Sequence, residues 1–389
     1  MEFLLWFSLF IAFYAFFGYG ILLFIIIKIK RAVKGKPVLP VVLADDLPTC
    51  TLIVAAYNEE SVMEEKINNS MALNYPKDKL EFVFITDGST DGTAGIVKKH
   101  KEIRNLHSDE RKGKIAAVHR AMDTVTSEVV VFTDANTFLN TDALVNICRH
   151  YSDVNVGAVA GEKRVHAEAG NATAGEGFYW KYESKLKTWD SELYSVVGAA
   201  GELFSIRTAL YKPVPANTIL DDFMISLLVA KDGYRVIYEP EAFATEGASQ
   251  NVTEELKRKI RIAAGGIQSI VWLKALLNPI PNPVLTFQYV SHRVLRWTVV
   301  PFFMLLALLI NLIIVFSGSI SLIYQLLLLA QVGFYLLAIS GWIMEERKIK
   351  IKIFFIPYYF CMMNYAVVMG IFRYLRGKQS AVWEKAKRQ

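Results

Sequence analysis

The sequence predicts an α/β domain, built on a doubly wound parallel sheet and placed between membrane-spanning helices. Two observations predict this arrangement. Apolar runs rich in valine and isoleucine alternate with helical patterns between residues 50 and 134, as in parallel sheets covered on both faces by helices. Long uncharged stretches lie near both ends of the chain, and each is long enough to cross ~30 Å of hydrocarbon.

The composition of the 389 residues also indicates a membrane protein with a water-soluble part. Hydrophobic residues make up 53% and charged residues 21% of the chain, against about 25% charged residues in average proteins. The net charge of +6 is too small to indicate a nucleic-acid partner. Cys50, Cys148 and Cys361 form no CxxC or Cys/His pattern, so we expect reduced thiols in a reducing compartment.

The first 30 residues are predicted to be an N-terminal transmembrane anchor. Residues 3–27 carry no charge, and lysines and arginines follow directly. A cleaved signal peptide would carry its positive charge before the apolar run. We therefore expect an uncleaved anchor at the plasma or inner membrane, with its N-terminus outside and the following soluble block in the cytoplasm.

The C-terminal third is predicted to return to the membrane. Residues 278–297 mix prolines, aromatic and basic residues, which is typical of an interfacial helix region. Residues 298–372 are expected to form membrane helices: two spans within the uncharged run 298–344, and a weaker stretch at 353–372. A basic tail, 373–389, follows. Four spans would place the tail outside, whereas the positive-inside rule favours the cytoplasm. Either the weak stretch is re-entrant or interfacial, or the charge rule fails here; we expect a cytoplasmic tail.

Residues 31–277 form the soluble region, and its first half predicts four strands. They are expected at 51–56, 81–86, 104–107 and 128–133, with helical patterns between them. In doubly wound sheets, ligands bind beyond the carboxyl ends of the strands. The residues that follow each strand are therefore the candidates for a site.

Polar clusters follow three of these strands. They are Tyr-Asn-Glu-Glu at 57–60, Asp-Gly-Ser-Thr-Asp-Gly at 87–92 and Asp-Ala-Asn at 134–136. Each alone could cap a helix or form a turn, but together they favour a nucleotide and phosphate site. A carboxylate beside a diphosphate requires a divalent cation such as Mg²⁺ or Mn²⁺. Neither GxGxxG nor GxxxxGK[ST] is present, which disfavours dinucleotide enzymes and P-loop NTPases.

These motifs, with Lys-Gly-Lys at 112–114, resemble those of a family 2 glycosyltransferase with the GT-A fold. Among membrane-integral members, the chain is similar to synthases of hyaluronan, cellulose, chito-oligosaccharides and poly-N-acetylglucosamine. The resemblance implies an inverting hexosyltransferase that uses a nucleotide-sugar donor, usually linked to UDP. It also implies a glycan or lipid-linked acceptor and contact with membrane lipid.

The same resemblance assigns roles to individual residues. It implies a donor site formed by Ala56, Tyr57, Glu59, Asp87, Lys112, Lys114, Asp134 and Arg261. The metal would be held by Asp134 and Asn136, where an amide replaces the usual second aspartate. An amide oxygen can coordinate a metal but contributes no charge.

The acceptor side is expected around residues 198–202 and 220–223. The resemblance implies that Gly201, Glu202 and Asp221 border the acceptor and that Asp222 is the catalytic base. An inverting transfer needs one base to take the proton of the attacking hydroxyl. A tight turn and the charged start of a helix are the simpler alternatives for these segments.

One departure from the family pattern concerns the length of the product. The tryptophan of the family's Gln-x-x-Arg-Trp motif is replaced by Ile262, which offers no flat face to a sugar; Trp383 in the tail could substitute. We expect a polysaccharide- or oligosaccharide-forming synthase. Two alternatives remain open: transfer of a single sugar to a polyprenyl-linked lipid, and a catalytically dead sugar-nucleotide-binding membrane protein. A transporter is disfavoured because 298–344 has no ionisable residue.

Overall fold

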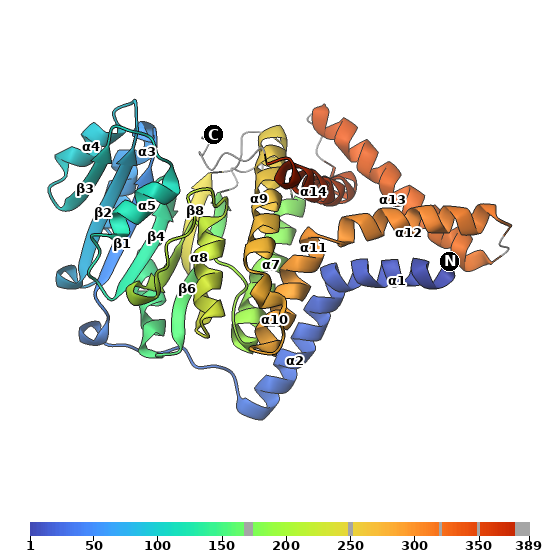
Figure 1. The fold of residues 1–389 in the computed structure, drawn as a ribbon, viewed down its shortest axis with the longest axis horizontal. Helices are drawn as coiled ribbons and strands as arrows, with labels where there is room; N and C mark the ends of the chain where they lie inside the picture. The colour runs from blue at the N-terminus through green and yellow to red at the C-terminus, as the bar shows by residue number, and fades with distance from the viewer. Residues whose placement is uncertain (167–173, 248–251, 319–320, 348–350, 378–389) are drawn as a thin grey trace.

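A computed structural model describes residues 1–166, 174–247, 252–318, 321–347 and 351–377. The soluble domain is built on one eight-stranded sheet in the order β3-β2-β1-β4-β7-β6-β8-β5 (Figure 1). Its strands are β1 (Cys50–Ala56), β2 (Leu80–Asp87), β3 (Ile103–Ser108), β4 (Val129–Asp134), β5 (Thr137–Leu139), β6 (Val156–His166), β7 (Phe204–Arg207) and β8 (Arg235–Gly247).

The first half of the sheet confirms the predicted doubly wound pattern. Strands β1 to β4 pair in parallel. They are connected by α3 (Glu60–Met71), α4 (Thr93–Lys99) and α5 (Lys114–Met122). The second half is mixed, because β7 runs antiparallel to both β4 and β6. That reversal was not predicted from the alternation of strands and helices.

Burial on both faces explains the uninterrupted apolar run of β1. Ile53 belongs to a core on one face of the sheet, which includes residues of α5 and of α8 (Asp221–Lys231). Leu52 and Val54 belong to the core on the other face, with α3 and α6 (Ala143–Cys148). That second core also contains Cys50 and Cys148, which are free thiols as expected.

The membrane part is formed by both ends of the chain. The N-terminal helix comprises α1 (Glu2–Phe13), a π-helical turn (Tyr14–Gly18) and α2 (Tyr19–Lys34). The C-terminal helices are α12 (Val300–Phe316), α13 (Leu322–Glu346) and α14 (Lys352–Leu375). In the described residues three helices are long and apolar enough to cross a membrane, or four if a bent pair formed by 283–297 and 300–316 counts as one span. The protein is therefore a membrane protein.

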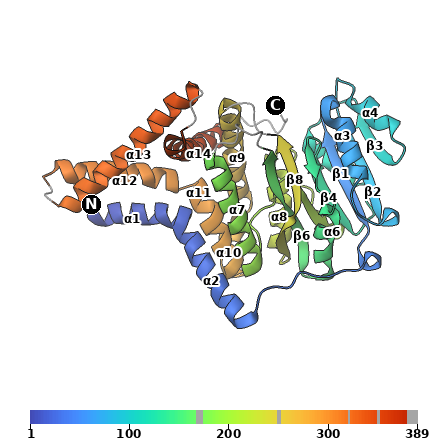
Figure 2. The same cartoon turned by 180° about the vertical axis from the view of Figure 1, so that it is seen from behind.

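The helices differ in direction. Figures 1 and 2 show α1 and α12 side by side, running away from the sheet, and Leu5 packs there against Ala307 and Ile310. Helix α14, in contrast, is seen almost end on, so it lies across them (Figure 1). It packs on α9 (Val252–Trp272) so closely that a Cβ at Gly370 would lie 2.6 Å from the Cβ of Ala263.

The segment expected to be interfacial faces protein on its polar side. It forms α10 (Pro283–Tyr289), a π-helical turn (Val290–Val294) and α11 (Leu295–Trp297). The buried imidazole of His292 lies between Asp190 (2.6 Å) and Glu183 (3.2 Å) of α7 (Ala174–Leu193). The segment 283–297 thus joins the soluble domain, which it contacts through His292, to α12, which follows it in the chain.

Candidate active site

The parallel register brings the predicted polar clusters to one edge of the sheet. Ala55 of β1 is paired with both Ile85 of β2 and Asp134 of β4. Strand β2 then ends at Asp87, which is paired with the last residue of β3. The segments that follow β1, β2 and β4 therefore lie next to one another, as expected for a ligand site in an α/β sheet.

A cavity of about 40 Å³ at this edge is lined by Ala56, Tyr57, Glu59, Asp87, Arg111, Lys114, Asp134 and Asn136, among others. Asp87 Oδ2 accepts hydrogen bonds from the backbone amides of Lys112 (3.0 Å) and Gly113 (2.7 Å). The other oxygen, Oδ1, is buried, accepts no hydrogen bond and lies 3.6 Å from the guanidinium of Arg120. It is available to a donor group of a ligand, such as a base N–H.

An arginine covers one wall of the same cavity. The guanidinium of Arg111 lies 3.7 Å from the centre of the Tyr57 ring, which is a cation–π contact. The chain approaches closely at this point, because a Cβ at Gly88 would lie 2.5 Å from Arg111 Cβ, and Gly88 has φ +65°. Glycine is the residue that tolerates both conditions.

The pair expected to hold a metal lies on the turn between β4 and β5. Asp134 accepts a hydrogen bond from Lys114 Nζ at 2.7 Å, and the Asn136 Oδ1 atom is buried without a hydrogen-bond partner. No group of three or more His, Cys, Asp or Glu residues suited to a metal occurs in the described part of the chain. Two protein oxygens fit Mg²⁺ or Mn²⁺ if donor phosphates and water supply the other ligands.

A buried lysine forms hydrogen bonds with residues on both sides of this turn. Lys66 of α3 is fully buried, and its Nζ donates to the Thr137 carbonyl (2.5 Å) and to Thr133 Oγ1 (3.2 Å). Burial lowers the pKa of Lys66 to about 7. The Thr133 hydroxyl in turn donates to the Glu202 carbonyl at 2.9 Å. These hydrogen bonds thus connect the turn that carries Asp134 and Asn136 with the loop that carries Glu202.

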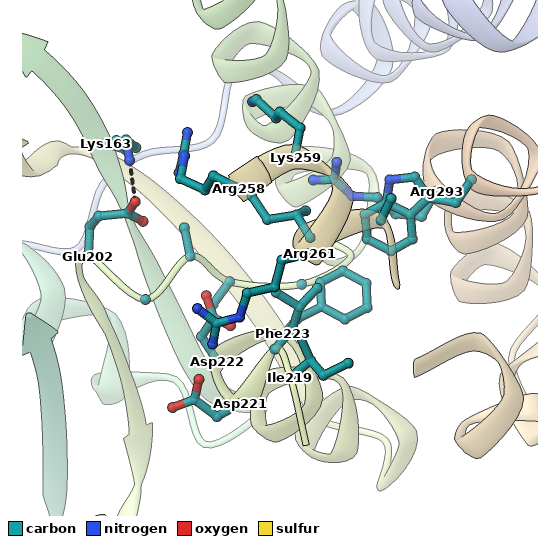
Figure 3. A pocket seen from close by; sticks show the side chains of 18 of the residues that line it. Lys163, Glu202, Ile219, Asp221, Asp222, Phe223, Arg258, Lys259, Arg261 and Arg293 are labelled. Carbon is teal, nitrogen blue, oxygen red and sulfur yellow. Dashed lines mark hydrogen bonds and ion pairs between the residues drawn. The ribbon is translucent and has the colours of Figure 1, made fainter. Parts of the chain in front are cut away.

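The larger cavity, about 290 Å³, lies between the sheet edge and the helices that lead to the membrane (Figure 3). Its wall includes Asp221 and Asp222 at the start of α8, Arg261 of α9, Trp297 of α11, and Met363, Ala366 and Val367 of α14. Lys114 and Asp134 line both cavities. The two cavities therefore meet at this pair.

Asp222 has the properties of a general base. Burial, reinforced by the neighbouring carboxylate of Asp221, raises the pKa of Asp222 to about 7. A Cβ at Gly201 would lie 3.2 Å from Asp222 Oδ2, so a side chain there would crowd the carboxylate. A base works best when its pKa is close to the working pH.

Cations surround these carboxylates. Burial lowers the pKa of Lys114, but Asp134 and Asp221 outweigh it and raise that pKa well above its usual range. Figure 3 shows the Arg261 side chain directed toward Asp221 and Asp222. No carboxylate lies within ion-pair distance of Arg261 in the described residues, and burial lowers its pKa. Lys114 and Arg261 are placed to attract an anion into the cavity.

Most of the predicted site residues line the two cavities, and two of them have other partners. The side chain of Lys112 is paired with Glu110 at the surface (3.0 Å) and is 57% exposed, so its backbone amide, bonded to Asp87, is the part that reaches the site. The carboxylate of Glu202 is paired with Lys163, which outweighs burial and lowers its pKa. Trp383 lies outside the described residues.

Three residues at the site were not singled out from the sequence. Arg111 directly precedes the Lys-Gly-Lys motif at 112–114, and this position in a basic run is a signal that it could belong to the site. Lys66 falls between the buried residues Met63 and Ile67 of α3, so its place on the buried face of a helix was the signal. Trp297 reaches the cavity from a distant segment, and no local pattern marks it.

Known proteins resemble this chain in sequence and in structure. Residues 51–213 match the sequence model of Glycosyl transferase family 2. The poly-beta-1,6-N-acetyl-D-glucosamine synthase of Staphylococcus aureus (strain COL) is 26% identical over 276 residues, covering 68% of this chain and 65% of the relative. The corresponding synthase of Staphylococcus epidermidis is 22% identical over 255 residues, covering 62% and 61%. The chain thus spans slightly less than two thirds of the length of these curated relatives.

A solved structure matches over nearly the whole chain. The mannosyltransferase PcManGT from Pyrobaculum calidifontis, solved in complex with GDP-Man and Mn2+, has a TM-score of 0.71 and 25% sequence identity. The match covers 97% of this chain and 100% of that chain. It includes the membrane helices as well as the sheet domain, and it confirms the predicted fold. The chain therefore has the GT-A fold flanked by apolar helices, and its residues 51–213 are similar in sequence to glycosyl transferase family 2.

Proposed function

We propose that the protein transfers a sugar, with inversion, from a nucleotide-diphosphate sugar to a hydroxyl of a glycan acceptor at the membrane, as a step in polysaccharide synthesis. One observation carries the proposal: Asp222 lines the larger cavity, and this cavity meets the smaller one at Lys114 and Asp134, which line both. A base and a diphosphate site at the two ends of one space are the two parts that such a transfer needs. The similarity to poly-N-acetylglucosamine synthases supports the polysaccharide.

In the proposed step Asp222 takes the proton of the acceptor hydroxyl while that oxygen attacks the anomeric carbon of the donor. The bond between this carbon and the diphosphate oxygen breaks from the opposite side, so the configuration inverts. The nucleoside diphosphate leaves with the electron pair. Lys114 and Arg261 stabilise the negative charge that develops on it.

The donor side is proposed to be formed by Ala56, Tyr57, Glu59, Asp87 and Arg111, which line the small cavity. A divalent cation held by Asp134 and Asn136 would neutralise part of the diphosphate charge. The buried, unpartnered oxygen of Asn136 supports this assignment. We propose UDP as the nucleotide, because Asp87 Oδ1 lies 3.6 Å from Arg120 but accepts no hydrogen bond from the protein, so it could accept one from the single N–H of uracil.

A second candidate is transfer of one sugar to a lipid-linked acceptor. The observation that favours it is the apolar wall that Met363, Ala366 and Val367 of α14 give to the larger cavity. Such a wall could accompany an apolar chain from the membrane to Asp222.

Donor turnover by the purified protein tests the proposal. Protein in lipid nanodiscs with Mn²⁺ is given a panel of UDP-sugars and GDP-mannose, and released nucleoside diphosphate is measured. We expect release from one UDP-sugar, and a glycan of several sugars by mass spectrometry without an added lipid acceptor. A one-sugar product that needs a polyprenyl carrier would support the second candidate, and no release from any donor would refute both.

A further inference from the structure

We propose that Trp297 forms the platform on which the acceptor sugar rests beside Asp222. The inference rests on the proposed transfer to a glycan and adds the side chain that recognises the ring. Trp297 is the last residue of α11 and reaches the larger cavity from the segment that joins the soluble domain to α12. It is half-buried, so part of its indole remains accessible.

The surroundings of Trp297 fix the indole near the proposed base. Its ring lies 5.3 Å from the ring of Phe223, which directly follows Asp222 in the sequence. It also packs on α9, where a Cβ at Gly266 would lie 2.4 Å from the Cε3 atom of Trp297. The missing side chain at Gly266 therefore makes room for the indole. Gly266 is one helical turn beyond Ile262, so the indole and Ile262 belong to the same stretch of wall.

The chemistry of the wall suits a sugar ring. The hydroxyls of a sugar leave patches of C–H groups on its faces, and a flat indole can cover such a patch. Arg293, with its guanidinium 5.7 Å from the centre of the Trp297 ring, lines the same cavity and can donate hydrogen bonds to the hydroxyls at the ring edge. An apolar face beside charged donors is the combination that binds a polar ring with an apolar side.

Trp180, the other indole in the cavity wall, is less suited to this task. The Lys163 and Lys259 ammonium groups lie 5.9 Å and 5.2 Å from its ring. Trp180 thus takes part in a cluster of cations and carboxylates around Glu202. Trp189 of α7 packs against Phe24 of the membrane anchor at 5.4 Å and does not line the cavity. It provides a matched control.

The test separates binding of the acceptor from binding of the donor. Trp297→Leu, Trp297→Phe and Gly266→Ala are compared with wild type in nanodiscs, using the donor that the wild type turns over. The acceptor probes are a β-1,6-linked N-acetylglucosamine pentasaccharide and a lipid extract of native membranes. We expect Trp297→Leu to raise the acceptor KM about tenfold while the donor KM stays within about twofold. Trp297→Phe should recover most of the loss.

Gly266→Ala provides an independent test, because it keeps the indole and displaces it. We expect it to lower the ratio of transferred to hydrolysed sugar as Trp297→Leu does, whereas Trp189→Leu should leave that ratio unchanged. An unchanged acceptor KM in Trp297→Leu, or the same loss in Trp189→Leu, would overturn the inference. So would a wild type that hydrolyses the donor but transfers to neither probe. A wild type that releases no nucleoside diphosphate would instead refute the proposed function.

Discussion

Asp222, the proposed base, has an environment that makes its protonation testable. Its pKa is raised to about 7 by burial and by Asp221, whereas an exposed aspartate titrates near 3.9. Only the ionised carboxylate can accept the proton of the acceptor. We therefore expect kcat/KM to rise with pH and to level off above about pH 7, in a pH–rate profile with saturating metal.

The substitution Asp222→Asn tests the role of the same carboxylate. Turnover should fall about 10²–10⁴-fold, since that is the usual contribution of a general base, while UDP affinity measured by calorimetry should remain close to that of wild type. Asp221→Asn is the matched control. It should lower turnover less, because Asp221 acts only through its charge on the pKa of Asp222. The reverse order would move the role of base to Asp221.

The raised pKa also has a consequence for stability. The native state holds the Asp222 proton more tightly than the unfolded chain does, so this group stabilises the fold below about pH 4 and loses that contribution as the pH rises to about 7. Asp222→Asn should therefore unfold at a higher temperature than wild type at pH 8. The difference should vanish near pH 4, as measured by thermal unfolding at the two pH values. A variant less stable than wild type at pH 8 would contradict the burial argument.

The charge of the proposed metal site, Asp134 and Asn136, gives a separate prediction. Asn136 contributes an oxygen without charge, and the Asp134 carboxylate is shared with Lys114. Asn136→Asp adds a negative charge beside the cation, so activity should persist and reach half its maximum at a lower Mn²⁺ concentration. Asp134→Ala should lose donor binding. Full wild-type activity in excess EDTA would contradict the metal assignment.

At the scale of elements, helix α7 is joined to the membrane helices by buried charge. His292 has no exposed surface and lies between the carboxylates of Asp190 and Glu183, while Arg296 donates to Glu183 at 2.5 Å and to the Ala15 carbonyl at 2.8 Å. Removing one partner of a buried charge network typically costs ~3–5 kcal/mol, because the remaining charges are left unpaired.

We therefore expect His292→Leu to lower the midpoint of thermal unfolding by several degrees in detergent. His292→Gln should recover part of the loss, since an amide can still donate a hydrogen bond to one carboxylate. His100, which pairs with the exposed Glu64 at the surface (3.2 Å), is the control, and His100→Leu should have little effect. Equal changes in the unfolding midpoint for His292→Leu and His100→Leu would show that the buried network stabilises the protein no more than a surface ion pair does.

The elements that could be predicted from the sequence are those with a local signal. Strands β1, β2 and β4 follow from apolar runs that contain Val or Ile, and the ends of these three strands follow from their polar clusters, because a parallel sheet aligns those ends. Strand β3 has a weaker signal, the short stretch 104–107. The antiparallel β7 and the contact of α14 with α9 depend on packing between distant segments. Lys66 and Trp297 belong to this second class: their roles come from what the fold places around them.

For the whole molecule, the position of the larger cavity is the main organising feature. It lies where the soluble domain meets α9, α11 and α14, so acceptor and membrane are reached from the same side. Figures 1 and 2 show α12 running away from the sheet and α13 returning toward it. Helix α14 lies across both and contributes to the cavity wall.

This arrangement predicts the side of the membrane on which the chain ends. Helix α14 is itself long and apolar enough to cross a membrane, but it packs against α9 of the soluble domain. We therefore expect the N-terminal helix, α12 and α13 to cross in turn and α14 to remain beside α9. We therefore expect the end of α14, at the exposed Arg376, to face the cytoplasm with the catalytic domain.

Cysteine labelling in intact cells tests this topology. A cysteine at Arg376 should resist a membrane-impermeant maleimide until the membrane is opened. A cysteine at the exposed Ser317, between α12 and α13, should react at once. Both are placed in a Cys361→Ala background, because Cys50 and Cys148 are buried in the sheet domain. Labelling of Arg376→Cys in intact cells would mean that α14 crosses the membrane, and its contact with the cavity would then have to be made within the bilayer.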